Sequence, residues 1–369
     1  MSAPAEVDVA VIGAGIVGLA ATDALARRGA HVVCLDGGGP GHGQSAGAAR
    51  GFRHLHDDPA LMRLARRSRT GWRAWEERAG TELLERGGVV RLGGDVEPDI
   101  AALREIGVQA RALDGAEAAR RMPWLAPEAG PLLLDPDGGA LRARAAIAAL
   151  ARFGDRLVRA RVEALEPSDE GVTVRTTAGE IRCRRCLVCA GAGTERLVAP
   201  LGIAIERDRR AHLRLTFATA GGVAADGPGP VWSDRSGRFG EGSYGVPEGP
   251  GRYALGLTVP DYPAISDPLA ETVTGGLDLR TQRARLIAYA AAAMPGLDPA
   301  PVDAVLRLTT TLRGASSDAF GLWARGGVLA FAGHNLFKHA PSLGELLADA
   351  ALDDGPPDPL LRPPRPAAA

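Results

Sequence analysis

Three glycines near the amino terminus have the spacing of a loop that binds phosphate groups. Gly13, Gly15 and Gly18 follow a β-branched run in the order GxGxxG. The first glycine permits a tight turn, the second lets the backbone approach a pyrophosphate, and the third lets a helix pack close to the preceding strand. The N–H groups at the start of that helix, at Ile16 and Val17, would then donate to the phosphate oxygens.

An acidic residue completes this pattern. A helix expected over residues 19–28 is closed by Gly29 and leads into the strand HVVCLD, which ends at Asp36. A carboxylate at this distance from the glycines can accept hydrogen bonds from an adenosine ribose, and it disfavours a 2′-phosphate. The segment from Val7 to Asp36 therefore predicts a site for FAD or NAD rather than NADP, with a chance glycine-rich turn as the alternative.

The cysteines raise the question of a metal centre, because Cys183, Cys186 and Cys189 form a CxxCxxC pattern. A ferredoxin run needs a fourth cysteine followed by proline, and a zinc site needs a fourth ligand. Neither stands nearby, and free cysteine is often a small core residue. We therefore expect these three and Cys34 to be buried, without a metal and without a disulfide.

Length and composition indicate a globular enzyme of two domains. The chain has 369 residues, 46% hydrophobic and 24% charged, with a formal net charge of −1. These values give no reason to expect nucleic acid or an anionic membrane as a partner. No apolar run reaches membrane-spanning length, so we expect a cytoplasmic protein. The Pro-rich residues 356–369 are expected to form a disordered tail.

The predicted elements suggest that the dinucleotide domain is discontinuous. The glycine-rich residues 37–59 cannot pack a core alone, and a helix capped by Asp58 is predicted from about residue 60 to 78. Residues 156–183 read as three antiparallel strands, and CLVCAGAGTERL reads as a strand, glycine turn and helix that could return to the first sheet. Strands dominate from about residue 205 to 311. We assign the dinucleotide domain to residues 1–80, 141–205 and 313–355, and a second domain to residues 81–140 and 206–312.

Three blocks of the sequence resemble the D-amino-acid oxidase superfamily of FAD-dependent oxidoreductases, and within it the monomeric sarcosine oxidase and N-methyltryptophan oxidase branch. They are residues 8–36, 44–75 and 330–352, and the last contains a loop, GHNLFK, similar to the family's glycine–His–Gly–aromatic–Lys loop with one residue inserted. The resemblance implies an α/β (α+β) fold, with a discontinuous Rossmann-like FAD-binding domain and a substrate domain built on a mixed β-sheet.

The resemblance also implies roles for single residues. Arg53 and Lys338 match the positions that clamp the substrate carboxylate, Arg50 matches an arginine near the flavin ring, and His334 matches a pocket histidine. The alternatives are a solvated loop for the arginines, a turn cap or solvent for Lys338, and a helix cap or the core for His334. Lys338 is also the only lysine of the chain. The predicted cofactor contacts are Gly13, Gly15, Ile16, Val17, Gly18, Asp36, Ser45, Arg50, Val162, Gly191, Gly333, Asn335 and Lys338.

Two departures from the family pattern bear on the chemistry. The branch attaches FAD through a cysteine where this sequence has Thr310 or Thr311, so we expect FAD to be bound non-covalently. It also carries an oxygen-activating lysine where this sequence has Ala254. Arg252 lies two residues away on the same strand face and is the candidate substitute.

The resulting expectation is an FAD enzyme that oxidises the C–N bond of a small amino or imino acid to the imine by hydride transfer to flavin N5. Oxygen is the expected electron acceptor and a monomer the expected state. The alternatives are a flavin dehydrogenase that uses another electron carrier, and a dinucleotide-binding protein that has lost catalysis.

Overall fold

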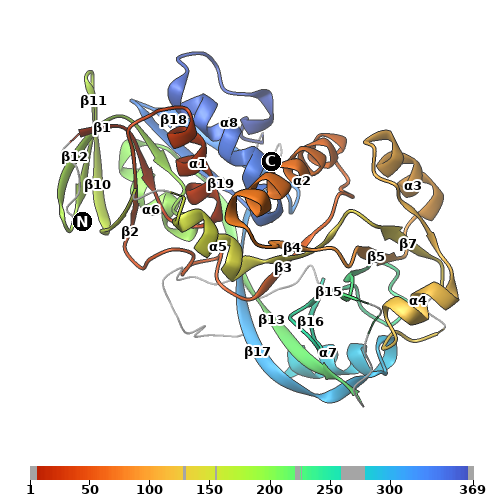
Figure 1. The fold of residues 1–369 in the computed structure, drawn as a ribbon. Helices are drawn as coiled ribbons and strands as arrows, with labels where there is room; N and C mark the ends of the chain where they lie inside the picture. The colour runs from red at the N-terminus through yellow and green to blue at the C-terminus, as the bar shows by residue number, and fades with distance from the viewer. Residues whose placement is uncertain are drawn as a thin grey trace. The chain divides into compact units, whose positions relative to one another are not determined.

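The computed structural model describes residues 6–127, 130–153, 156–220, 225, 227–258 and 279–364. The chain divides into two compact units, both discontinuous in sequence (Figure 1). The first unit comprises Met1–Gly47, Ala143–Arg209 and Thr309–Ala369, and the second comprises Ala48–Arg142 and Arg210–Leu308.

The first unit is built on a sheet whose central strands are parallel. The order β10-β11-β12-β1-β2-β9 is extended by β19, which pairs with β12, and by β18, which pairs with β19. The pairs β12–β1, β1–β2, β2–β9 and β12–β19 are parallel, as in buried α/β sheets. The strands are β1 (Glu6–Ile12), β2 (Val32–Asp36), β9 (Leu157–Arg159), β10 (Val162–Ser168), β11 (Gly171–Thr176), β12 (Gly179–Val188), β18 (Phe320–Arg325) and β19 (Val328–Gly333).

Two helices of this unit lie side by side, α1 (Ile16–Arg27) and α8 (Ala340–Leu352) (Figure 1). They approach so closely at Gly344 that a Cβ atom there would lie 2.7 Å from the backbone carbonyl of Ala20. Arg28, which follows the last residue of α1, forms an ion pair of 2.8 Å with Glu345 of α8. The remaining helices are α5 (Ala143–Ala151), η1 (Gly191–Gly193), α6 (Thr194–Val198), η2 (Ala199–Leu201), η4 (Leu336–His339) and η5 (Pro359–Leu361).

The cysteines lie in the core of this unit. Cys34 is on β2, Cys183 and Cys186 are on β12, and Cys189 directly follows it; all four are free and buried. The prediction that they are small core residues is confirmed.

The second unit is built on a mixed sheet in the order β17-β13-β16-β15-β14-β5-β7-β6. The β14–β5 pair is parallel, whereas the β13–β16, β16–β15, β15–β14, β5–β7 and β7–β6 pairs are antiparallel. The strands are β5 (Val89–Leu92), β6 (Arg111–Leu113), β7 (Leu132–Asp135), β13 (Arg207–Thr219), β14 (Val231–Asp234), β15 (Ser243–Pro247), β16 (Arg252–Leu257) and β17 (Leu297–Leu312).

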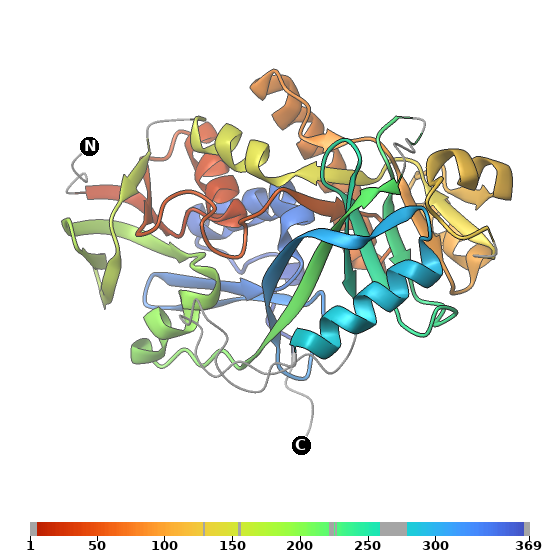
Figure 2. The ribbon, with the colours of Figure 1, turned by 90° about the horizontal axis from the view of Figure 1, so that it is seen from below.

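One face of this sheet packs against α7 (Leu279–Ala293), which lies along β13 and β16 (Figure 2). Leu286 and Tyr289 of the helix join Leu215, Phe217 and Leu255 of these strands in one apolar cluster. The other elements of this unit are a small sheet, β3 (Ala49–Phe52), β8 (Gly139–Arg142) and β4 (Leu84–Glu85), and the helices α2 (Pro59–Ala79), α3 (Val96–Glu105) and α4 (Gly115–Arg121).

The fold class predicted from the sequence, including the mixed sheet, is confirmed. Several details differ. Residues 48–80 cluster with the second unit, because β3 pairs with β8 and Met62 packs against Ile100 and Leu103. Strand β9 runs parallel to β2 instead of joining an antiparallel set.

The carboxy-terminal residues, which were expected to form a disordered tail, also differ from the prediction. Residues 356–364 are described, and η5 lies within them because the apolar side chain of Leu361 is buried. In the described part of the chain, no helix is long and apolar enough to cross a bilayer.

Candidate FAD-binding and substrate sites

The glycine turn between β1 and α1 brings backbone against backbone. Gly13 has φ of 104°, a conformation that side chains disfavour, and a Cβ atom there would lie 2.6 Å from the carbonyl oxygen of Cys189. A Cβ at Gly18 would lie 1.9 Å from the oxygen of Gly13. Both positions therefore exclude side chains for the reasons that the GxGxxG spacing predicts.

Gly15 differs from Gly13 and Gly18, because no backbone atom lies close to the position that its Cβ atom would take. The nearest atom to a Cβ at Gly15 is the Ser45 hydroxyl oxygen, 3.3 Å away. Helix α1 has no side-chain cap from its own N-cap residue, Gly15, and the Ser45 hydroxyl instead accepts a hydrogen bond of 3.0 Å from the N–H of Ile16. A pyrophosphate could approach this turn without meeting a side chain of the glycine, so the turn fits the group that the motif predicts.

Asp36 links this turn to the loop that follows β2. One carboxylate oxygen accepts a hydrogen bond of 2.8 Å from the N–H of Ala14, and the other accepts bonds of 2.8 Å from Gly38 and Gly39. Main-chain N–H groups thus orient both oxygens of the Asp36 carboxylate. Because each carboxylate oxygen has two acceptor sites, Asp36 can still accept a ribose hydroxyl.

The loop after β2 forms one wall of an open cavity. The cavity has a volume of about 390 Å³, and its other wall is α5. Gln44 of this loop donates a hydrogen bond of 3.1 Å to the Thr310 hydroxyl, and its amide oxygen lies 3.1 Å from where a Cβ of Gly191 would stand. The structure therefore brings Thr310 and Gly191 to the same loop. The lining residues are Pro40, Gly41, Ser45, Ala46, Gly47, Arg144, Ile147, Ala148 and Ala151.

A buried arginine that sequence reasoning missed holds the Gly191 turn. Arg207 donates hydrogen bonds of 2.8 Å to the carbonyl of Gly191 and of 3.1 Å to that of Ala192. Burial lowers the pKa of Arg207, and nearby Glu195 opposes that shift. Val162, also predicted to contact the cofactor, has its side chain in the core of the sheet.

The last βα turn of the first unit contains four of the predicted residues. Gly333 ends β19 against Phe320, and Asn335 adopts the left-handed conformation with φ of 55°. The N–H of His334 donates to the carbonyl of Ala319 at 3.3 Å. The turn therefore has a defined backbone, from which Lys338 emerges.

Lys338 is buried, with 3% of its side chain exposed. Its ammonium donates a hydrogen bond of 3.1 Å to the carbonyl of Asn335 and lies 3.7 Å from the carboxylate of Asp318. Asp318 also accepts a hydrogen bond of 2.5 Å from the Asn335 amide. Of the alternatives for Lys338, solvent exposure is excluded, whereas a contact within the turn is present.

In the second unit, Arg53 follows β3 and is fixed by the residues after it. The N–H of His54 donates to Asp135 at 3.1 Å, and its ring Nδ1 lies 2.9 Å from the same carboxylate. Both His54 and Asp135 are buried. Arg53 itself donates a hydrogen bond of 3.2 Å to the carbonyl of Leu55.

Arg50 lies with other arginines of the second unit. Its guanidinium and that of Arg214 donate to the same acceptor, the carbonyl of Ala49, at 2.9 Å and 3.4 Å. Burial, together with the charges of Arg307 and Arg214, lowers the pKa of Arg50 to about 9. The group therefore stays protonated at neutral pH, in a region of positive potential.

The surroundings of Ala254 also differ from the sequence-based picture. Ala254 is buried in an apolar cluster with Val246 and Val231, whereas Arg252 is exposed at the start of β16. Arg214, on the neighbouring strand, is buried. The sequence carried a signal for it, because His212, Arg214 and Thr216 alternate with apolar residues along one strand.

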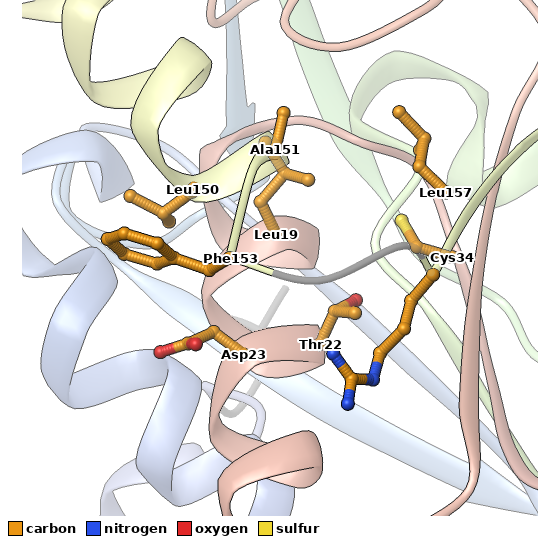
Figure 3. Close-up of a pocket in the computed structure, with 9 residues that line it drawn as sticks. Leu19, Thr22, Asp23, Cys34, Leu150, Ala151, Phe153 and Leu157 are labelled. Carbon is orange, nitrogen blue, oxygen red and sulfur yellow. The ribbon is translucent and has the colours of Figure 1, made fainter. Parts of the chain in front are cut away.

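A second, small cavity lies in the first unit between α1, β2 and α5 (Figure 3). Leu19, Thr22, Asp23 and Cys34 line one side of it, and its volume of about 20 Å³ has room for a single water molecule. Burial raises the pKa of the Cys34 thiol to about 12, so this cysteine is not a nucleophile. This cavity is too small for an organic ligand.

Comparison with known proteins agrees with this geometry. The family described as FAD dependent oxidoreductase matches residues 8–350. The chain belongs to this family. FAD is therefore the cofactor that the glycine turn and Asp36 are suited to bind, and the prediction of FAD is confirmed.

The curated relatives include two kinds of oxidase. The N-methyl-L-tryptophan oxidase of Citrobacter koseri is 31% identical over 209 residues, which cover 53% of this chain and 56% of that protein. The monomeric sarcosine oxidase of a Bacillus species is 29% identical over 212 residues, 54% of each chain. The chain thus spans about half the length of these relatives. The monomeric sarcosine oxidase of Streptomyces avermitilis is 28% identical over 372 residues, covering 94% of this chain and 93% of that one.

Among solved structures, the open form of NikD, described as an unusual amino acid oxidase essential for nikkomycin biosynthesis, has a TM-score of 0.84 and 25% identity over 98% of both chains. The chain therefore has the fold of an amino acid oxidase over nearly its whole length.

We predict that FAD is released from this protein by acid. Thr310 is bonded to the loop that borders the cavity, and a hydroxyl is a far poorer nucleophile than a thiolate. Acid precipitation of the holoprotein should leave yellow FAD in the supernatant. Flavin that stays in the pellet after extensive washing would show a covalent link.

A second prediction concerns the residues behind Arg53. Replacing Asp135 by Asn removes the charge that the buried His54 ring and N–H contact, which should lower the free energy of unfolding by about 1.5–3 kcal/mol. The matched control is Asp137→Asn, two residues away and less buried, which should change the stability by less than about 0.5 kcal/mol. Urea denaturation measures both, and equal effects would show that the contact does not stabilise the second unit.

Proposed function

We propose that the protein oxidises the C–N bond of a small amino or imino acid to the imine, with oxygen as electron acceptor. The observation that carries this proposal is the buried ammonium of Lys338 in the last βα turn of the first unit. The Asn335 carbonyl and the Asp318 carboxylate hold this ammonium in place. It is therefore a fixed cation at the position that, by the family resemblance, contacts the substrate carboxylate.

The residues of the chain have distinct tasks in this proposal. Bound FAD supplies the redox chemistry, since its ring can accept a hydride equivalent from the carbon next to nitrogen. Lys338 provides a compact charge for the carboxylate, and Arg53 is proposed as a second, bidentate partner on the strength of the family resemblance. Fixing the carboxylate fixes the orientation of the C–H bond, which is a large part of the catalytic effect in such enzymes.

The alternative acceptor is a carrier other than oxygen. It is favoured by Ala254, because an alanine in an apolar cluster cannot stabilise the charge of superoxide. Anaerobic mixing with a panel of amino and N-methyl amino acids, followed by admission of air, separates the possibilities. Bleaching of the flavin supports either enzyme, fast recovery in air supports the oxidase, and slow recovery supports the dehydrogenase. An enzyme function is contradicted if no compound of the panel bleaches the flavin.

Replacing Lys338 by Met tests the carboxylate contact. Loss of one charge-assisted hydrogen bond costs about 1.5–3 kcal/mol, so kcat/KM for the best carboxylate substrate should fall roughly ten- to a hundredfold. A carboxylate-free analogue of the same amine is the control, and it should show almost no difference between the wild type and the variant. Equal losses on both compounds would mean that Lys338 supports the flavin or the turn through Asn335 and Asp318.

A further inference from the structure

We propose that the substrate carries a second anionic group, and that Arg50, Arg214 and Arg307 of the second unit bind it. The inference rests on the proposed function and narrows its substrate class to dicarboxylic amino or imino acids. Three features of the sheet face opposite α7 support it: the placement of the arginines, the position of a tyrosine hydroxyl beside them, and the charge of the region.

The first feature is the way that β13 presents its side chains. Leu213, Leu215 and Phe217 belong to the apolar side of the strand, against which α7 packs. His212, Arg214 and Thr216 alternate with them and therefore lie on the opposite face. On that face Arg214 pairs with Glu248, so β13 presents charged and polar groups there instead of a second apolar layer.

Two of the guanidiniums are placed together by the backbone. Arg50 and Arg214 donate to one shared oxygen, the carbonyl of Ala49, at 2.9 Å and 3.4 Å. Like charges at this separation repel each other, and an anion beside them converts that repulsion into attraction. Glu248 forms an ion pair with Arg214 and accepts a hydrogen bond of 2.9 Å from Thr216, which orients the Arg214 fork.

The second feature is a tyrosine hydroxyl at the same place. Arg214, Gly256 and Tyr244 are direct neighbours across β13, β16 and β15. A Cβ atom at Gly256 would lie 2.4 Å from the Tyr244 hydroxyl oxygen, so the ring crosses the middle strand where the glycine leaves room. The hydroxyl lies 2.7 Å from Nε2 of His212 on β13. The tyrosine oxygen is therefore held on the side where the arginines lie.

The third feature is the charge of the region. Arg307 lies on β17, the strand next to β13 in the sheet. Its charge and that of Arg214 add to the effect of burial in lowering the pKa of Arg50, and burial lowers the pKa of Arg214 to about 10. Burial raises the pKa of Tyr244, and all three arginines oppose that shift. Tyr244 is thus a neutral hydrogen-bond donor at neutral pH beside cations. Guanidinium forks and a hydroxyl donor are the set that proteins use to bind carboxylates.

The substrate test uses pairs of compounds that differ only in the second charge. Both enantiomers of glutamate and glutamine, aspartate and asparagine, and their N-methyl forms are compared with the holoenzyme. The acidic member should have a kcat/KM at least tenfold higher than its amide. Arg307→Met should reduce kcat/KM for the acid by about ten- to a hundredfold and leave the amide within about twofold. The matched control is Arg313→Met, an exposed arginine just beyond β17, which should leave both unchanged.

A binding measurement separates this inference from the proposed function. Glutarate has two carboxylates and no amine, so it cannot be oxidised at a C–N bond; butyrate has one. Calorimetry with the holoprotein should show that glutarate binds more tightly than butyrate, and that Arg307→Met removes this preference. If glutarate shows this pattern but no amine bleaches the flavin, the anion site stands and the proposed oxidation fails.

Two results would overturn the inference. One is equal affinity for glutarate and butyrate in the wild type, with no acidic preference among the amines. The other is an Arg307→Met variant that re-oxidises its flavin more slowly in air but binds glutarate as before, because that result assigns the arginines to the electron acceptor. The double variant Arg214→Met/Glu248→Gln removes both members of the ion pair and provides a second test if Arg307→Met fails to fold.

Discussion

The first unit depends on main chain approaching main chain at two glycines. The carbonyl of Gly13 occupies the space where Gly18 would carry a side chain, and the carbonyl of Cys189 occupies the corresponding space at Gly13. These contacts fix β1, the turn and α1 as one piece and join β12 to them. The carboxylate of Asp36 then holds Ala14 in the turn and Gly38 in the next loop. These contacts hold the turn in the shape that the GxGxxG spacing predicts, with N–H groups at the start of α1 that would donate to a pyrophosphate.

The buried cations of the two units are stabilised in different ways. Lys338 and Arg207 donate to main-chain carbonyls of the turns that they hold, so each has a structural role in the first unit whatever it binds. Arg50 and Arg214 both donate to one carbonyl, that of Ala49. Burial and the positive charges of the neighbouring arginines lower the pKa of Arg50 and so disfavour its protonated form. Glu248 pairs with Arg214 and so compensates part of this charge within the second unit. The region nevertheless stays rich in cations, as the lowered pKa of Arg50 shows.

The sequence allowed the first unit to be predicted in more detail than the second, for a physical reason. Gly13, Gly18 and Asp36 act through contacts close in sequence or through a turn of fixed geometry, so their spacing carries the information. Lys338 was noticed because it is the single lysine, and the sequence could not show that Asp318 would lie beside it. The pairing of β9 with β2 and the burial of Leu361 depend on contacts between distant segments, which local patterns do not specify.

The positions of the arginines in the second unit also depend on contacts between distant segments, which the sequence alone does not specify. Alternation along β13 places Arg214 on the face opposite α7, but only the register of three strands sets it beside Gly256 and Tyr244. A shift of one residue would turn Arg214 toward α7 and bury a charge among apolar side chains. The core residues Leu215 and Phe217 therefore fix the register, and the register fixes the arginine. Apolar packing on one face of the sheet thus determines the chemistry available on the other.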